Sequence, residues 1–322
     1  MAAKDYLQKK NEFLSDAAMR DFHLGSEEAG NWRVSWGHVD LEICRLWKSP
    51  GTMGESVKVA VIDTGVSSAD NDLRGRISLS SISLIGGALE DQSKSHHGTM
   101  SAGLIGADGN KAGRVLGVAP GCELISLKAG NENFYPANVE LALRKARELQ
   151  AKIVSISIED YHAPPPAIRR LILDCAEDGM IVLAAAGDLG TSDLSYPASC
   201  EGCISVGAYL LDEQGRRVVW PGSNHNIFVK FLAPGNNLLT CSATAAPAFY
   251  DGTSAAAAFA AGVMALAASA VGIGRIDYHR IVGCLSAGKC CDVIGDAPSP
   301  SDDQGYGVLD PSALVARLRN DT

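Results

Sequence analysis

The chain has 322 residues, a formal net charge of −9 at pH 7, and 46% apolar and 20% charged residues. This length and composition are typical of a soluble globular protein with one large α/β domain or two smaller domains. The negative charge argues against a nucleic-acid partner, because phosphate binding needs a basic face.

The most apolar segment and the polar N-terminal segment argue against a membrane span and a signal peptide. The most apolar stretch, residues 255–271, is rich in alanine and predicts a buried helix rather than a transmembrane span. Residues 1–31 are polar and charged, and they lack the apolar core of a secretory signal peptide. We therefore expect a tail or short regulatory segment over residues 1–31, a folded domain over 32–322, no membrane partner, and an intracellular, cytoplasmic location. The oligomeric state stays open.

Nine cysteines are present at irregular spacing. Cys200 and Cys203 form a C-x-x-C pair, and Cys290 and Cys291 are adjacent. A structural zinc site needs two close pairs with matching spacing, which the adjacent cysteines do not supply. We expect reduced structural thiols, as is usual inside cells.

From residue 57 onward, apolar β-branched runs alternate with segments of helical spacing. We expect strands at 57–63, 122–128, 152–158, 180–188 and 203–210, and helices at 97–106, 136–150 and 166–179. This alternation predicts an α/β fold with a mostly parallel sheet, in which ligands bind beyond the carboxyl ends of the strands. Asp63 and Asp188 both stand at such predicted ends.

Three short segments together indicate nucleophilic catalysis. Ser254 lies in DGTSAAAA, where the alanines favour a helix and place Ser254 at its N-terminus. The unpaired N–H groups there can stabilise a developing oxyanion, and Gly252 lets a substrate backbone approach. Alone, Gly-Thr-Ser would be an ordinary helix cap. With Asp63-Thr-Gly and His97-Gly-Thr it forms the more specific order Asp, His, Ser.

Further segments extend the pattern: VAVIDTG, HGTMSAG, GVAP, AAAGD, YPA, SVGA, APG, GTSAAAA and GYGVLD. In this order they resemble the subtilase family of serine peptidases over residues 32–318, in a divergent intracellular branch. The resemblance implies a peptidase domain with a three-layer α/β fold, its mostly parallel central sheet flanked by helices. It implies acyl transfer, with Ser254 as nucleophile, His97 as general base and Asp63 orienting His97. The substrate-binding residues it implies are Ser157, Ile158, Glu159, Ala185, Ala186, Gly187 and Gly252.

Asp188 and Glu159 depart from the family pattern, as does Ala258, which replaces the usual proline after the nucleophile. Asp188 stands where most subtilases carry the asparagine of the oxyanion hole, and an ionised carboxylate cannot donate a hydrogen bond. Losing that donor costs about 10²–10³ in kcat in subtilisin. Activity would need a protonated Asp188 or the Ser254 N–H alone. Glu159 replaces a usual glycine, and it either favours a basic residue before the scissile bond or faces solvent.

The resemblance also suggests a structural calcium ion, and no cofactor is needed for the chemistry. Asp72 matches a family ligand, while Asp108 and Asn110 lie in the loop that usually supplies its companions. Calcium takes about six to eight oxygens, so a polar surface loop stays an alternative.

Three functions remain open from the residues. The first is a serine endopeptidase that acts on peptide or protein substrates. The second is a weak or inactive pseudo-peptidase that binds peptides or proteins. The third is a peptide ligase or macrocyclase on the same fold, since a fold does not fix its chemistry.

Overall fold

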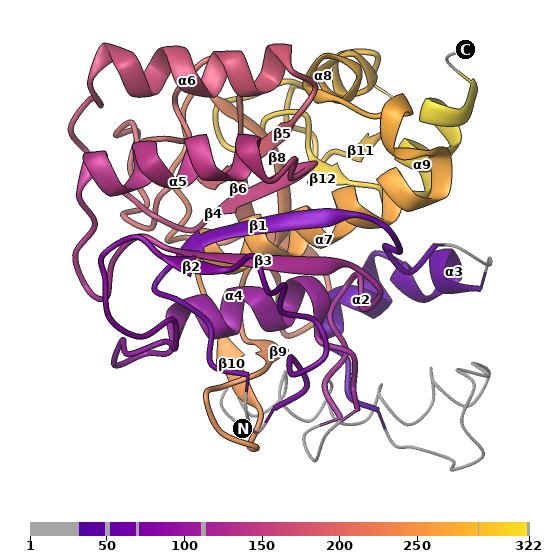
Figure 1. Ribbon diagram of the computed structural model, residues 1–322. Coiled ribbons are helices and arrows are strands. Elements are labelled where there is room, and N and C mark those ends of the chain that lie inside the picture. Colours follow the sequence, from indigo (N-terminus) through magenta and orange to yellow (C-terminus); the bar gives the residue numbers. More distant parts are fainter. Residues whose placement is uncertain (1–31, 49–51, 69–70, 111–113, 289, 321–322) are drawn as a thin grey trace.

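The computed structural model describes residues 32–48, 52–68, 71–110, 114–288 and 290–320 (Figure 1). The predicted tail over residues 1–31 lies outside the described residues. The helices are α2 (Trp36–Asp40), α3 (Ile43–Trp47), α4 (His97–Gly106), α5 (Pro136–Glu148), α6 (Pro166–Glu177), α7 (Thr253–Val271), α8 (Tyr278–Ser286) and α9 (Pro311–Asn320), with a 3₁₀ turn at Ile273–Arg275. The strands are β1 (Lys58–Asp63), β2 (Ile82–Ser83), β3 (Glu123–Lys128), β4 (Ile153–Ile156), β5 (Ile181–Ala185), β6 (Cys203–Leu211), β7 (Arg217–Val219), β8 (Val229–Pro234), β9 (Leu238–Thr240), β10 (Ala248–Tyr250), β11 (Cys291–Asp292) and β12 (Val308–Leu309).

Within the described ranges, one sheet has the order β11-β12-β8-β6-β5-β4-β1-β3-β2, with β7 paired to β6. Its neighbours run parallel, except for the antiparallel pairs β11–β12 and β6–β7. Strand β1 shows why the sheet is central: Val59 and Val61 face one core while Ala60 and Ile62 face the other. A strand buried on both faces requires such a continuous apolar run.

Helices cover both faces of this sheet (Figure 1). Helices α5 and α6 lie over one face, and α4 and α7 lie under the other, each with its own buried core cluster. The α/β fold with a mostly parallel sheet flanked by helices, predicted from the sequence, is confirmed. The predicted strands and helices are present with ends shifted by a few residues.

Helix α7 is long and apolar enough to cross a membrane by length and composition alone. In the fold, however, 89% of its most apolar 18-residue window is buried. Its small side chains let it pack closely on α4, and a side chain at Gly262 would collide with Val118. We therefore assign α7 as a core helix, as the alanine-rich sequence predicts.

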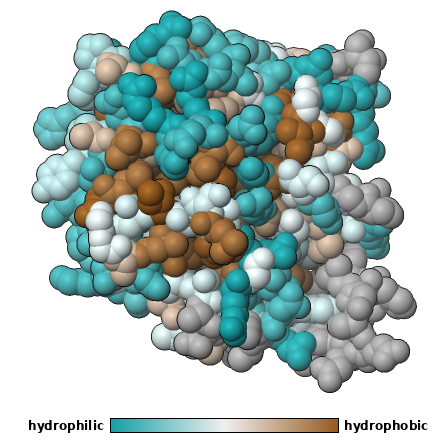
Figure 2. All heavy atoms as spheres, in the orientation of Figure 1, coloured by the Kyte–Doolittle hydropathy of each residue, from teal (hydrophilic) through white to brown (hydrophobic). Residues whose placement is uncertain are grey.

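Strand β2 forms one edge of the sheet and leaves apolar side chains exposed. Leu79, Ile82 and Ile85 are all solvent-exposed. In Figure 2, apolar surface gathers between α5 and α4, where the edge of the sheet lies. Ser83 of β2 pairs with Lys128 of β3, which pairs in turn with Asp63 at the end of β1.

Candidate active site

The predicted site residues meet at the carboxyl edge of the parallel sheet. Strand β1 ends at Asp63, β4 leads into Ser157, and β5 leads into the segment that carries Asp188. A cleft of about 300 Å³ lies there, and His97, Glu159, Asp188 and Ser254 are among its lining residues. Parallel strands deliver their carboxyl ends to one edge, so residues far apart in the chain become neighbours.

Asp63 and His97 form a close pair. Asp63 Oδ1 lies 2.7 Å from His97 Nδ1, and Asp63 is 1% exposed. Asp63 Oδ1 also accepts the Thr64 N–H at 2.7 Å, and Oδ2 accepts the Ser101 hydroxyl at 3.0 Å. Burial would lower the pKa of His97, but the charges of Asp63, Asp91 and Asp188 outweigh it and raise that pKa above its ordinary value. His97 is therefore oriented by the bond at Nδ1, and Nε2 is its other hydrogen-bonding atom.

Asp91 supports this pair, and no motif in the sequence marks it. Its Oδ1 accepts the Thr64 hydroxyl at 2.9 Å and both the N–H and hydroxyl of Ser93. Its Oδ2 accepts the N–H and hydroxyl of Thr99 at 2.9 and 3.0 Å. One buried carboxylate thus joins the end of β1, the loop before α4 and the first turn of α4, which carries His97.

Ser254 is the second residue of α7 and is 5% exposed. The turn before the helix needs Gly252, because its φ of +104° is disfavoured for other residues and its α-carbon lies against Asp188. Across the cleft, the Ser157 hydroxyl donates to the Ser254 carbonyl at 3.3 Å. Ser254 therefore lies at a helix N-terminus, as predicted from the alanine-rich segment, and its carbonyl accepts the Ser157 hydroxyl.

The partner of His97 Nε2 is unexpected. Among the described residues no hydrogen bond joins Ser254 Oγ to His97, and Nε2 instead lies 2.9 Å from the Tyr250 hydroxyl. Tyr250 is 3% exposed, and its ring meets His97 edge to face at 5.3 Å between centroids. Sequence analysis missed Tyr250, because a tyrosine four residues before Ser254 has no chemical signature of its own.

Asp188 lies three residues beyond β5, so the predicted strand 180–188 was too long at this end. Its Oδ1 accepts the Thr253 N–H at 2.7 Å and the Thr253 hydroxyl at 2.6 Å, while Oδ2 takes no part in these bonds. The Thr253 hydroxyl in turn accepts the Gly187 N–H at 3.0 Å. Asp188 is open to solvent on one side, yet protein crowds its carboxyl group: this desolvation raises its pKa, although Thr253 and His97 pull it down.

Glu159 follows the end of β4 and turns into the site rather than away from it. Its Oε2 accepts the Asp188 N–H at 3.2 Å and the Tyr161 hydroxyl at 2.9 Å. Desolvation, together with the charge of Asp188, raises the pKa of Glu159. This part of the cleft thus carries two carboxyl groups with raised pKa values.

The other predicted substrate-binding residues form the walls between these groups. Ser157 and Ile158 are each 5% exposed, and Ala185 and Ala186 are buried. Gly187 has a φ of +111° and approaches Asn224 and Tyr161 so closely that a side chain would collide. The segments after β4 and β5 therefore face the cleft mainly through backbone, with Glu159 and Asp188 as the protruding groups.

The predicted calcium ligands have other partners. Asp72 Oδ2 accepts the Val115 N–H at 2.9 Å, and Asp108 Oδ2 lies 3.4 Å from Arg76 Nε. Asn110 is exposed, and its N–H donates to Asp108. The described parts of the chain contain no group of three or more His, Cys, Asp or Glu suited to a metal ion. This donor set alone does not fit calcium, and because residues 111–113 lie outside the described residues, the ion stays a prediction.

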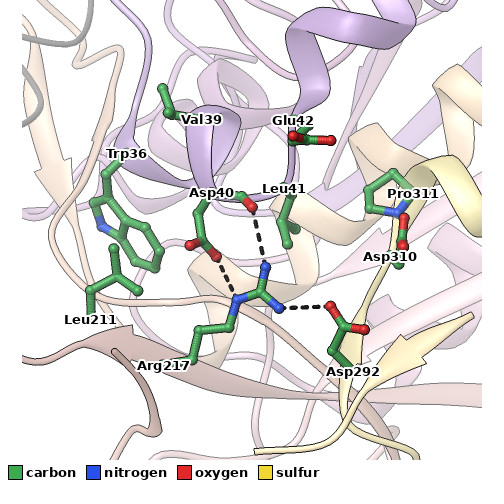
Figure 3. A pocket seen from close by; sticks show the side chains of 10 residues that line it. All are labelled: Trp36, Val39, Asp40, Leu41, Glu42, Leu211, Arg217, Asp292, Asp310 and Pro311. Carbon is green, nitrogen blue, oxygen red and sulfur yellow. Dashed lines mark hydrogen bonds and ion pairs between the residues drawn. The ribbon is translucent and has the colours of Figure 1, made fainter. Parts of the chain in front are cut away.

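A second cavity, of about 470 Å³, lies outside the catalytic cleft (Figure 3). There Arg217 of β7 joins Asp40 of α2 and Asp292 of β11, each through a 2.9 Å contact. Tyr209 donates its hydroxyl to Asp40 at 2.6 Å. These bonds tie the N-terminal helices to the far end of the sheet. No predicted site residue lines this cavity, so the smaller cleft is the candidate active site.

All nine cysteines are free thiols. Burial raises the pKa of Cys122 to about 12 and that of Cys200 to about 11. Buried thiols with raised pKa values are poor nucleophiles and poor metal ligands. Cys200 and Cys203 of the C-x-x-C pair lie in the core cluster on the α5 and α6 side of the sheet. We therefore interpret them as structural thiols.

Comparison with known proteins agrees with this geometry. Residues 54–279 match the model of the subtilase family, Peptidase S8. Subtilisin BL of Lederbergia lenta is 32% identical over 207 residues, which are 63% of this chain and 73% of that protein. The major intracellular serine protease of Bacillus subtilis (strain 168) is 31% identical over 221 residues, 65% of this chain and 67% of that protein. Subtilisin E of the same strain is 31% identical over 250 residues, 74% of this chain and 62% of that protein. The chain therefore belongs to the subtilase family of serine endopeptidases.

Proposed function

We propose that this protein hydrolyses peptide bonds through an acyl-enzyme on Ser254. His97 is the general base, and Asp63 holds it in the correct tautomer and stabilises the imidazolium. The observation that carries the proposal is the 2.7 Å Asp63–His97 bond at a cleft that also contains Ser254 at a helix N-terminus. Water then attacks the acyl-enzyme and releases the acyl group as a carboxylic acid.

The oxyanion is stabilised by the Ser254 N–H and a neutral Asp188. Both Thr253 donors bind Asp188 Oδ1, which suits a carbonyl oxygen and leaves Oδ2 to carry a proton. A carboxyl group kept neutral by its surroundings can donate to an oxyanion. The desolvation that raises the pKa of Asp188 favours this neutral form.

A fluorophosphonate probe, which reacts with activated serines, tests the proposal. We expect the wild type to be labelled and Ser254→Ala to stay unlabelled. Circular dichroism should show that both proteins are folded. If the wild type and Asp188→Asn both stay unlabelled, the chain has no activated serine and the proposal is wrong.

One observation favours a second candidate, a pseudo-peptidase that binds peptides without cleaving them. His97 Nε2 is engaged by Tyr250, and a general base that cannot reach the Ser254 proton would be idle. The two candidates differ in one result: the pseudo-peptidase retains a peptide in the cleft while Ser254 stays unreactive. Labelling of Ser254 in the wild type would exclude it.

We also propose an intracellular location with peptide or protein substrates. The likeness to a Bacillus intracellular serine protease and nine unpaired cysteines support it, since oxidising compartments favour disulfides. Fractionation of cells that express a tagged full-length chain would test the location.

A further inference from the structure

The second nitrogen of the general base is bound by a residue other than the nucleophile. His97 Nε2 lies 2.9 Å from the hydroxyl of Tyr250, the last residue of β10, and the two rings cross at 86°. A carboxylate only accepts hydrogen bonds, so His97 Nδ1 is the donor in its 2.7 Å bond to Asp63. In the neutral ring Nε2 is then an acceptor, and Tyr250 donates to it.

This bond takes the atom at which the base must receive a proton. The unprotonated nitrogen of a neutral imidazole accepts through a single lone pair in the plane of the ring. While Tyr250 donates to that lone pair, Ser254 cannot. The proposed mechanism requires the Ser254 proton to move to the same atom, His97 Nε2. In this structure the base is therefore closed to the nucleophile.

The Tyr250 hydroxyl has a second partner. It lies 3.1 Å from Ser101 Oγ, and either oxygen can donate in that pair. Ser101 also donates to Asp63 Oδ2 at 3.0 Å. A hydroxyl gives one proton and accepts through its lone pairs, so Ser101 can donate to Asp63 and accept from Tyr250. Rotation of the Tyr250 O–H bond toward Ser101 would therefore free His97 Nε2 without leaving a buried hydroxyl unpaired.

The surroundings keep this hydroxyl protonated and allow it to move. Tyr250 is buried, and burial, together with the charge of Asp63, raises the pKa of Tyr250 well above its ordinary value. Strand β10 pairs with β9 in a two-stranded sheet, apart from the central sheet in which β1 carries Asp63. A small shift of this hairpin would move the hydroxyl off His97 Nε2 and leave the strand that ends at Asp63 in place.

We infer that Tyr250 is an autoinhibitory latch on the general base. The inference rests on the proposed function. In the closed state the Tyr250 hydroxyl donates to His97 Nε2, and Ser254 is not activated. In the open state that hydroxyl donates to Ser101, and Nε2 accepts from Ser254 as the triad mechanism requires. The switch exchanges hydrogen bonds only, and Tyr250 keeps its proton in both states.

The first test compares Tyr250→Phe with Tyr209→Phe. Tyr250→Phe removes the latch hydroxyl and keeps the ring, whereas Tyr209→Phe removes a buried hydroxyl that donates to Asp40, outside the cleft. A hydrogen bond of ordinary net strength would leave about one molecule in ten open, and the labelling rate scales with the open fraction. We therefore expect the fluorophosphonate to label Tyr250→Phe about tenfold faster than wild type, and Tyr209→Phe at the wild-type rate. Unfolding temperatures should show that both variants are folded.

A double-mutant cycle separates a latch from a change in packing. Ser101→Ala removes the donor to Asp63 and also the second acceptor for Tyr250. In the wild-type background it should slow labelling through both losses, whereas in the Tyr250→Phe background only the loss at Asp63 remains. We expect the slowing to be about threefold larger in the wild-type background. Equal slowing in the two backgrounds would overturn the latch.

The remaining outcomes separate the latch from the proposed function. If wild type is labelled and Tyr250→Phe is labelled no faster, the hydroxyl does not restrain the base: the latch is wrong and the peptidase function stands. If only Tyr250→Phe is labelled, the latch is supported and the proposed function fails for the wild-type protein. If no protein is labelled at Ser254, both proposals fall together.

Discussion

Carboxyl groups stand on both sides of the cleft. The proposed base side lies around Asp63 and His97, and the proposed oxyanion side lies around Asp188 and Glu159. Asp63 is almost fully buried and receives donors on both oxygens. Asp188 is open to solvent on one side and receives its two Thr253 donors on a single oxygen. Donors to both oxygens stabilise the anion, whereas an oxygen without one can keep a proton.

The same two sides differ in what supports them. Behind His97, Asp91 links three segments through hydrogen bonds to Thr64, Ser93 and Thr99. Behind Asp188 stands a second acid, Glu159, bound to the Asp188 N–H. The two sides therefore differ in the surroundings of their carboxyl groups: Asp63 receives donors on both oxygens, whereas desolvation raises the pKa of Asp188 although its Thr253 donors lower it.

The largest effect should come from breaking the base side. Asp63→Asn replaces an acceptor by an amide that can donate toward His97 Nδ1, which favours the wrong tautomer. We expect Ser254 labelling and kcat/KM to fall by roughly 10⁴-fold. A loss within about tenfold of wild type, in a variant that keeps its unfolding temperature, would contradict this role for Asp63.

A substitution at Asp188, on the proposed oxyanion side, should increase activity, whereas Asp63→Asn lowers it. Neutral Asp188 is a donor only below its raised pKa, so wild-type kcat/KM should fall as pH rises through that pKa. His97 must be neutral to act, so its raised pKa moves the acid limb of the profile upward. Asp188→Asn donates at every pH and should exceed wild type by up to about 10²-fold at alkaline pH.

One result would contradict this pH prediction. If Asp188→Asn is no faster than wild type at alkaline pH, Asp188 does not limit catalysis as an anion. Thr253→Ser keeps the hydroxyl and N–H that bind Asp188 and serves as a matched control, for which the falling limb should remain.

Asp91 should matter mainly for stability. Asp91→Asn places an amide N–H group among donors from Thr99 or Ser93, and we expect the free energy of unfolding to fall by about 2 kcal/mol. Its lost charge should also move the acid limb of the activity profile to lower pH, because Asp91 raises the pKa of His97. Glu148→Gln, an exposed change on α5, should alter stability by less than about 0.5 kcal/mol.

The two sides of the cleft also differ in how far sequence predicts them. The strand before Asp63 and the alanine-rich helix after Ser254 are local patterns, so their place at the sheet edge follows from the chain itself. The strand predicted over 180–188 ends early, because Ala186 and Gly187 are buried in a turn and look like strand residues. Apolar residues are buried both in paired strands and in buried turns, so hydropathy alone does not show where a strand ends.

Tyr250 and Asp91 could not have been predicted from spacing. Tyr250 contacts His97 from a position 153 residues away, and Asp91 supports His97 through its bonds to Thr64, Ser93 and Thr99; neither residue lies in a repeated pattern. The inward turn of Glu159 likewise depends on Tyr161 and the Asp188 N–H, partners that only the folded cleft brings to it. Side-chain direction at a loop is a tertiary property.

The smallest effect should come from Glu159. Its carboxyl lines the cleft, and because its pKa is raised, its charge develops only as pH rises through that value. Wild type should then prefer a basic over an apolar residue before the scissile bond, with the preference growing as pH rises. Glu159→Gln should reduce the ratio of the two kcat/KM values by at most about fivefold, the range of a solvent-exposed ion pair. Asp160→Asn removes the neighbouring charge, bound to His162, and should leave the ratio unchanged. Equal preference in wild type at every pH would show that Glu159 shapes the cleft without selecting the substrate.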